Sequence, residues 1–120
     1  MNQLRKPTYS HLPFTSLNRV RYFEDYEAGA IHELGNVLVD RDEMKGFASK
    51  YDPQKIHTDE SFARSGPFGE LIASGWQTAG LMMRLYATRY LSDSSSIASP
   101  GMENLRWTNP VYGGDMLFVH

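Results

Sequence analysis

The chain has 120 residues, of which 41% are hydrophobic and 22% are charged, as is typical of one globular domain. Its formal net charge of −2 gives no reason to expect a nucleic acid or an anionic membrane as a partner. The sequence contains no cysteine, which excludes disulfides, thiolate nucleophiles and cysteine-ligated zinc. No apolar run resembles a secretory signal or a membrane span, so we expect the cytoplasm as the location.

Residues 1–20 are expected to form an N-terminal arm, because Pro, Ser, Asn and Arg are mixed there without periodicity. The remaining residues, 21–120, then form the domain. It begins with an aromatic stretch, and the β-branched residues at positions 31, 37 and 39 predict a strand over residues 31–40.

A short amphipathic helix is predicted over residues 41–50, where apolar side chains recur at spacings of three and four. Asp40 and Glu43 resemble a capping box at its start. Pro53 disfavours helical backbone angles at the residue before it, so the helix should end by Tyr51.

The longest periodic element is predicted to begin at Ser74, which fits a capping box together with Gln77. Apolar residues recur from Ile72 to Tyr90 and also occupy the opposite side, which predicts a helix that is buried nearly all round. A single helical turn is expected before it, at residues 59–64.

Short strands are expected after residue 101, because Leu105 and Trp107 alternate and turn residues follow them. A further strand is expected to start near residue 115. A long helix needs a sheet to wrap it, so the order of elements predicts an α+β fold with an antiparallel sheet curled around the helix. The strands are few and His120 falls in mid-strand, so we expect a truncated domain or strands supplied from elsewhere.

Chemistry is most plausible in the segment "YDPQKIHTDE", where Asp52 and His57 stand five residues apart. Non-helical chain of this length can turn back so that both side chains face one water molecule and form a general acid/base pair. The alternative is that Asp52 caps a turn and His57 is a half-exposed loop residue. On spacing alone, this alternative is the more common case.

The segment "IASGWQT" places Gly75 at the expected start of the long helix. Unpaired N–H groups at a helix start carry partial positive charge, and a glycine lets a ligand approach the backbone closely. The amide of Gly75 could therefore stabilise an oxyanion. The alternative is a glycine required for tight packing. The histidines at 11, 32 and 120 lie at no metal-ligand spacing, so no metal site is predicted.

Taken together, "FASKYDPQKIHTDESFARSGPFGELIASGWQT" and "SPGMENLRWTNPVYGGDMLFV" resemble the MaoC-like dehydratases, a hot-dog-fold family that includes R-specific enoyl-CoA hydratases. The resemblance covers residues 21–119 and implies a long helix wrapped by an antiparallel sheet. It also implies pairing into a homodimer or higher homo-oligomer, with an acyl-CoA substrate bound at the interface and no separate cofactor. R-hydratases of the family often have Asp-x-Asn-Pro-x-His, where this chain has Asp-Pro-Gln-Lys-Ile-His.

The resemblance also implies roles for individual residues in the reversible addition of water to a 2-enoyl-CoA. Asp52 and His57 would hold the water and return a proton, and the Gly75 N–H would bind the thioester oxygen. The flanking residues expected to contact the substrate are Tyr51, Ile72, Ser74 and Trp76. Two alternatives stay open on the same fold, an acyl-CoA thioesterase and a non-catalytic acyl-thioester-binding subunit.

Overall fold

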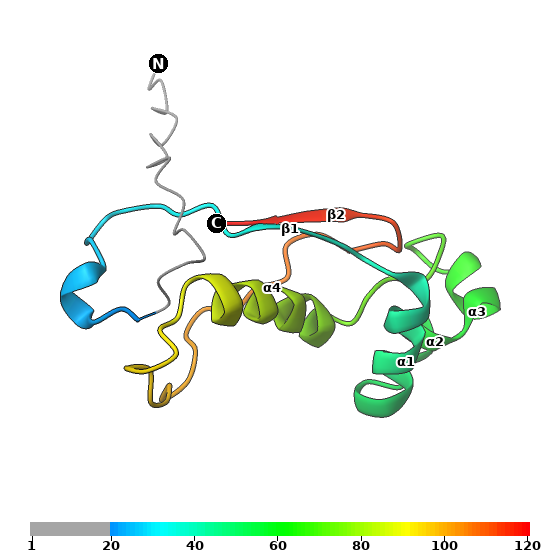
Figure 1. Ribbon diagram of the computed structural model, residues 1–120. Coiled ribbons are helices and arrows are strands. Elements are labelled where there is room, and N and C mark those ends of the chain that lie inside the picture. Colours follow the sequence, from blue (N-terminus) through cyan, green and yellow to red (C-terminus); the bar gives the residue numbers. More distant parts are fainter. Residues whose placement is uncertain (1–19) are drawn as a thin grey trace, which may run out of the picture.

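In the computed structural model, which describes residues 20–120, two strands lie across a central helix and three short helices gather beyond its N-terminal end (Figure 1). The predicted N-terminal arm lies outside the described residues, apart from Val20. The elements in chain order are η1 (Phe23–Asp25), β1 (Gly35–Leu38), α1 (Arg41–Tyr51), α2 (Lys55–Thr58), α3 (Glu60–Arg64), α4 (Gly75–Arg89) and β2 (Met116–Val119). The predicted α+β class is confirmed.

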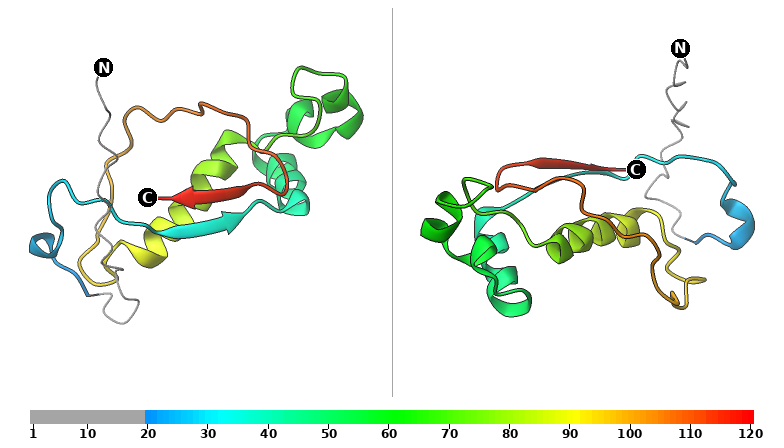
Figure 2. Two further views of the ribbon diagram at one scale, coloured as in Figure 1. Left: turned by 90° about the horizontal axis from the view of Figure 1, so that it is seen from above. Right: turned by 180° about the vertical axis from the view of Figure 1, so that it is seen from behind.

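The sheet within residues 20–120 has two antiparallel strands, β1 and β2. Their register places Gly35 opposite Val119 and Leu38 opposite Met116. Seen from above, the two strands run side by side over α4 (Figure 2). Their inward side chains meet this helix, because Val37 and the neighbouring Val39 belong to the same buried cluster as residues of α4.

The hydrophobic core joins the strands to α1 and α4. Its buried members are Leu34, Val37, Val39, Met44, Ala73, Leu81 and Leu85. Each of the valine, leucine and methionine side chains among them stabilises the fold by about 1.5–3 kcal/mol when fully buried. The core therefore fixes the start of α4 against the end of the strand that leads into α1.

The prediction that α4 is buried nearly all round is wrong for this chain. The helix buries one face, which carries Gln77, Leu81 and Leu85. On the outer side, Trp76 is 57% exposed and Met83 is 45% exposed. The reason is that a two-stranded sheet covers only one side of a helix, so the apolar residues opposite have no layer over them.

The strand predictions are partly confirmed. Strands do form within residues 31–40 and after residue 115, although each has only four residues. No strand forms at residues 102–109, contrary to the prediction from Leu105 and Trp107. An extended segment becomes a strand only when a neighbour pairs with it, and the nearest pairing here is one isolated bridge between Ile72 and Tyr112.

The helix predictions hold better. Asp40 caps α1 by accepting a hydrogen bond from the Glu43 N–H at 2.9 Å, and the helix ends at Tyr51 as Pro53 requires. The expected turn at residues 59–64 is α3. In the part of the chain that the structure describes, no helix combines the length and the apolar composition needed to cross a bilayer.

Candidate active site

The C-terminal end of α1 places Asp52. Its backbone N–H donates to the Ala48 carbonyl at 2.9 Å, and its φ of −151° then turns the chain out of the helix. Because proline follows, the helix cannot continue through this residue. The Asp52 side chain is thereby held at a fixed point on the end of α1, only 16% exposed.

His57 lies on α2, a single helical turn that the sequence did not predict. The segment from Asp52 to His57 was expected to be non-helical throughout. Instead, Gln54 adopts an extended conformation as the N-cap, and its carbonyl accepts the His57 N–H at 2.9 Å. The tight turn points the imidazole inward and leaves its side chain 7% exposed, so His57 is no half-exposed loop residue.

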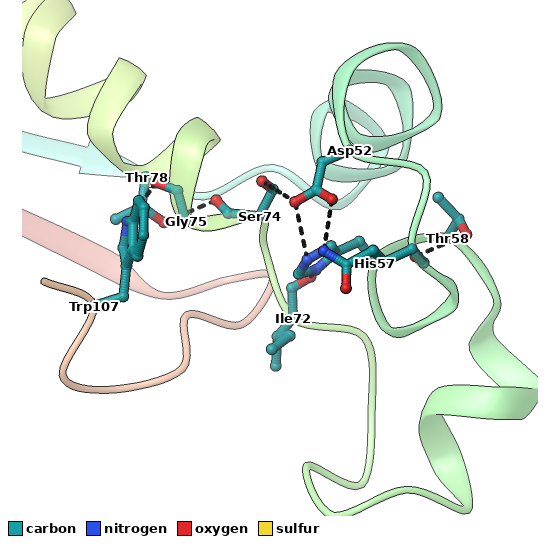
Figure 3. A network of polar contacts seen from close by, with 9 residues as sticks. Asp52, His57, Thr58, Ile72, Ser74, Gly75, Thr78 and Trp107 are labelled. Carbon is teal, nitrogen blue, oxygen red and sulfur yellow. Dashed lines mark hydrogen bonds and ion pairs between the residues drawn. The ribbon is translucent and has the colours of Figure 1, made fainter.

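Asp52 and His57 meet, as the acid/base interpretation of this segment expected and the loop-residue alternative did not (Figure 3). The His57 Nε2 lies 3.3 Å from the Asp52 Oδ2. A carboxylate and an imidazole at this separation can share a proton or hold one water molecule between them and a substrate.

The other ring nitrogen of His57 is fixed by the main chain. Its Nδ1 lies 2.7 Å from the carbonyl oxygen of Ile72, which comes from the segment before α4. A carbonyl can only accept a hydrogen bond, so Nδ1 carries a proton in either charge state of the ring. It follows that Nε2, which faces Asp52, is the nitrogen that gains and loses a proton.

Ser74 does not cap α4 as predicted. The helix has no side-chain cap, and the Ser74 hydroxyl instead donates to the Asp52 Oδ2 at 2.7 Å. A hydroxyl has one proton to donate, and a bond to a carboxylate is stronger than a neutral one. Ser74 is fully buried, so this contact ties the start of α4 to the end of α1.

A second donor reaches the other oxygen of Asp52. The Gln54 Nε2 donates to Oδ1 at 2.8 Å. The hydrogen bond from Ser74, then that from Gln54, lower the pKa of Asp52 below its ordinary value, and the nearby His57 adds to this effect. Asp52 is therefore ionised at neutral pH and can accept a proton.

Gly75 is the first residue of α4, but the space beside it is already occupied. A Cβ built on Gly75 would overlap the indole of Trp107, whose Nε1 donates to the Gly75 carbonyl at 2.7 Å. Close packing therefore requires this glycine, as the alternative interpretation of Gly75 in the sequence predicted. The same indole borders a cavity of about 270 Å³ that is also lined by Gly75, Ile72 and Thr78.

The start of α4 leaves backbone N–H groups without a helical acceptor. The first helical hydrogen bond runs from the Thr78 N–H to the Ser74 carbonyl at 3.1 Å, so the three preceding N–H groups have no acceptor within the helix. Asp52 and His57 do not line the cavity beside Gly75. The two parts of the site are joined through Ser74, which binds Asp52 and immediately precedes Gly75.

The four residues expected to contact a substrate lie in different places. Ser74 and Ile72 support the acid and the imidazole directly. Trp76 is exposed and contacts Trp107 edge-on, with the ring centroids 5.2 Å apart. Tyr51 is 64% exposed and packs against Phe47 on the outer side of α1.

Gln54 was missed in the sequence. The signal that could have revealed it is an amide side chain two residues after the acid and three before the histidine, on the same short turn. Within residues 20–120, no three His, Asp or Glu side chains gather in a way that could hold a metal ion.

Comparison with known proteins gives a consistent result. The MaoC like domain matches residues 29–120. The chain is 36% identical over 102 residues to 3-hydroxybutyryl-CoA dehydratase of Methylorubrum extorquens, covering 84% of this chain and 62% of that protein. It is 32% identical over 96 residues to the uncharacterized protein YdeM of Bacillus subtilis, covering 80% and 68%. The chain thus spans about two thirds of the length of these relatives.

Solved structures agree with this match. A MaoC-like dehydratase from Rhodospirillum rubrum superposes with a TM-score of 0.73 at 40% identity, covering 82% of this chain and 66% of that one. R-hydratase PhaJ1 from Pseudomonas aeruginosa superposes with a TM-score of 0.64 at 26% identity, covering 88% and 61%.

Proposed function

Because the chain belongs to the MaoC like domain family and has its hot-dog fold, we propose that it carries out the reversible addition of water to a 2-enoyl thioester. The single observation that carries this proposal is the pairing of Asp52 with His57 at 3.3 Å, with the histidine tautomer fixed by Ile72. The names of the relatives, which include a 3-hydroxybutyryl-CoA dehydratase, support an acyl-CoA as the substrate.

The reaction needs one group to take a proton from water and one to give a proton to the substrate. In hydration, the water oxygen bonds to C3, the double bond electrons move toward the carbonyl, and C2 receives a proton. Asp52 is ionised and the His57 Nε2 faces it, so the pair can accept the proton of the water and return one to C2. Dehydration is the same sequence in reverse.

Negative charge grows on the thioester oxygen as C3 is attacked. We assign its binding to the Gly75 N–H, because this group lies at the positive end of the α4 dipole without a helical acceptor. One such donor contributes about 3–4 kcal/mol to the transition state in well-studied enzymes. The Trp107 indole beside Gly75 would then form one wall of the thioester site.

CoA enters this proposal as part of the substrate, and no separate cofactor is required. Assembly into a homodimer or a larger homo-oligomer belongs to the same proposal, because apolar side chains of α4 are left exposed in the single chain. A cytoplasmic location stays a prediction.

Hydration is tested with crotonyl-CoA, whose enoyl absorbance falls as water adds across the double bond. The purified protein should remove this absorbance, and Asp52→Asn should lower kcat/KM by about 10²–10⁴-fold, the usual contribution of a general acid or base. Asp42→Asn is the matched control, since Asp42 is an exposed carboxylate on the same helix.

Two other outcomes would contradict hydration. Release of free CoA, detected with a thiol reagent, in step with the fall in enoyl absorbance indicates a thioesterase, because hydration leaves the thioester intact. Saturable binding of crotonyl-CoA by a folded protein, with neither product formed from short or long enoyl chains, indicates a non-catalytic binding subunit.

A further inference from the structure

We propose that Gln54 is a positioning residue, which holds the Asp52 carboxylate in one orientation and ties it to the backbone of His57. This inference rests on the proposed hydration for its kinetic consequences, but its geometric part concerns only contacts within the chain. It gives a role to a residue that stands between the acid and the histidine, with its side chain bound to Asp52 and its backbone carbonyl bound to the His57 N–H.

Three of the hydrogen bonds of Gln54 involve the acid or the histidine. Its backbone N–H donates to the Asp52 carbonyl at 2.8 Å, and its side-chain Nε2 donates to the Asp52 Oδ1 at 2.8 Å. Its own carbonyl accepts the His57 N–H at 2.9 Å. One residue therefore sets the position of the acid relative to the start of the short helix that carries the imidazole.

The side-chain bond matters because a carboxylate can rotate. The last torsion of an aspartate is broad and two-fold, so a carboxylate held by one oxygen retains rotational freedom. Ser74 and His57 both contact Oδ2, whereas Gln54 binds Oδ1. With a partner on each oxygen, the carboxylate plane is fixed, and Oδ2 stays directed at Nε2.

The environment of Gln54 makes it suitable for substitution. Its side chain is exposed, so a replacement leaves no cavity in the core. Lys55, the next residue, directs its ammonium over the Phe62 ring at 5.6 Å from the centroid and not toward Asp52. Lys55→Met is therefore a control on the same turn that leaves the acid's contacts in place.

The test uses three substitutions in the purified protein. Gln54→Met keeps the length of the side chain but removes the amide, Gln54→Glu places a carboxylate against Asp52, and Gln54→Asn keeps the amide on a shorter stem. With crotonyl-CoA, we expect kcat to fall roughly tenfold for Met, further for Glu and least for Asn, because a hydrogen bond to a charged group has this order of effect. KM should change little.

A second readout separates positioning from activity. Removing a donor raises the pKa of Asp52, so the acidic limb of the kcat/KM profile should move to higher pH in Gln54→Met and more so in Gln54→Glu. The titration of the Asp52 carboxyl carbon, followed by ¹³C NMR, should move in the same direction, with no movement in Lys55→Met.

The possible results are distinct. If Gln54→Met leaves both the Asp52 titration and kcat at wild-type values, the inference is overturned. If the wild-type protein does not hydrate any enoyl-CoA but the titration still moves in Gln54→Met, the positioning role stands and the proposed function fails.

Discussion

At the scale of single residues, the ionisation state of Asp52 depends on its hydrogen-bond donors. The Ser74 hydroxyl and the Gln54 amide each bind one of its oxygens, and both stabilise the ionised form. Ser74 is buried, whereas Gln54 is exposed, so removing the Ser74 donor should lower the free energy of unfolding more than removing the Gln54 donor. The Ser74 contact should contribute to stability as well as to reactivity.

Ser74→Ala should lower the free energy of unfolding at pH 7 by about 1.5–3 kcal/mol, the usual contribution of a hydrogen bond to a charged group. Because the pKa of Asp52 is lowered in the folded state, this stabilisation is present above the unfolded-state pKa and is lost as the pH falls through the folded-state pKa. The difference from wild type should therefore shrink only below about pH 4. Urea unfolding at pH 7, 5 and 3.5 measures it.

Ser65→Ala provides the control. The Ser65 hydroxyl donates to the Ser61 carbonyl at 3.1 Å, a neutral acceptor, so its small effect should not change over this pH range. A Ser74→Ala difference that is equally constant would show that Asp52 is not the group stabilised.

The meeting of Asp52 and His57 was expected from the family resemblance, because their five-residue spacing alone is more common in residues that do not form such a pair. The partner of Ser74 was not predicted from the sequence. A helix cap would have placed the Ser74 hydroxyl against the N–H of a residue three positions on, but the hydroxyl instead binds a carboxylate 22 residues away. Local patterns contain only the first of these options. Gln54 was overlooked for the opposite reason: its contact is local, but a single exposed amide has no recognised spacing.

At the scale of elements, the start of α4 is fixed by a contact with a distant loop. Trp107 packs against Gly75 from the segment between the helix and β2, and its indole fills the space where a side chain would begin. Gly75→Ala should therefore destabilise the protein by about 1–3 kcal/mol, because the indole must move. Thermal or urea unfolding, followed by tryptophan fluorescence, measures both effects.

The sign of this effect should reverse once the indole is gone. Alanine favours a helix over glycine by up to about 1 kcal/mol, so Gly75→Ala made in a Trp107→Leu background should be neutral or stabilising. Gly46→Ala in α1 is the matched control, since nothing lies within 4 Å of a Cβ at that helical position. Additive effects of Gly75→Ala and Trp107→Leu would contradict the packing described.

Helices were easier to predict than strands for a physical reason. The periodicity and caps of α1 lie within the helix and its flanking residues, as Asp40 and Pro53 illustrate. A strand at residues 102–109 would have needed a partner, which its own alternation cannot specify. The prediction that α4 is buried nearly all round was wrong for the same reason, because the number of layers over a helix depends on the whole sheet.

At the scale of the whole molecule, the outer face of α4 exposes large apolar side chains that a second copy of the chain could cover. Trp76 and Met83 lie seven residues apart on one side of this helix, and both are about half exposed. If this face is covered by another copy of the chain, Met83→Glu should convert an oligomer to a monomer, because burying an unpaired charge is strongly unfavourable.

Sedimentation velocity measures this change, and circular dichroism checks that the variant remains folded. Thr88→Glu is the control, since it places the same charge at an exposed polar position of the same helix. A wild-type protein that sediments as a monomer at all concentrations, or a Met83→Glu variant with an unchanged mass, would contradict assembly through this face.

The acceptor that orients the His57 ring is the Ile72 carbonyl, which is part of the peptide backbone. Unlike an orienting aspartate or asparagine, it cannot be deleted by changing a codon, because every amino acid supplies the same oxygen. Drift at position 72 can therefore alter the lining of the neighbouring cavity while the choice of reactive nitrogen is inherited unchanged. Substrate preference and proton chemistry can thus evolve independently at this one position.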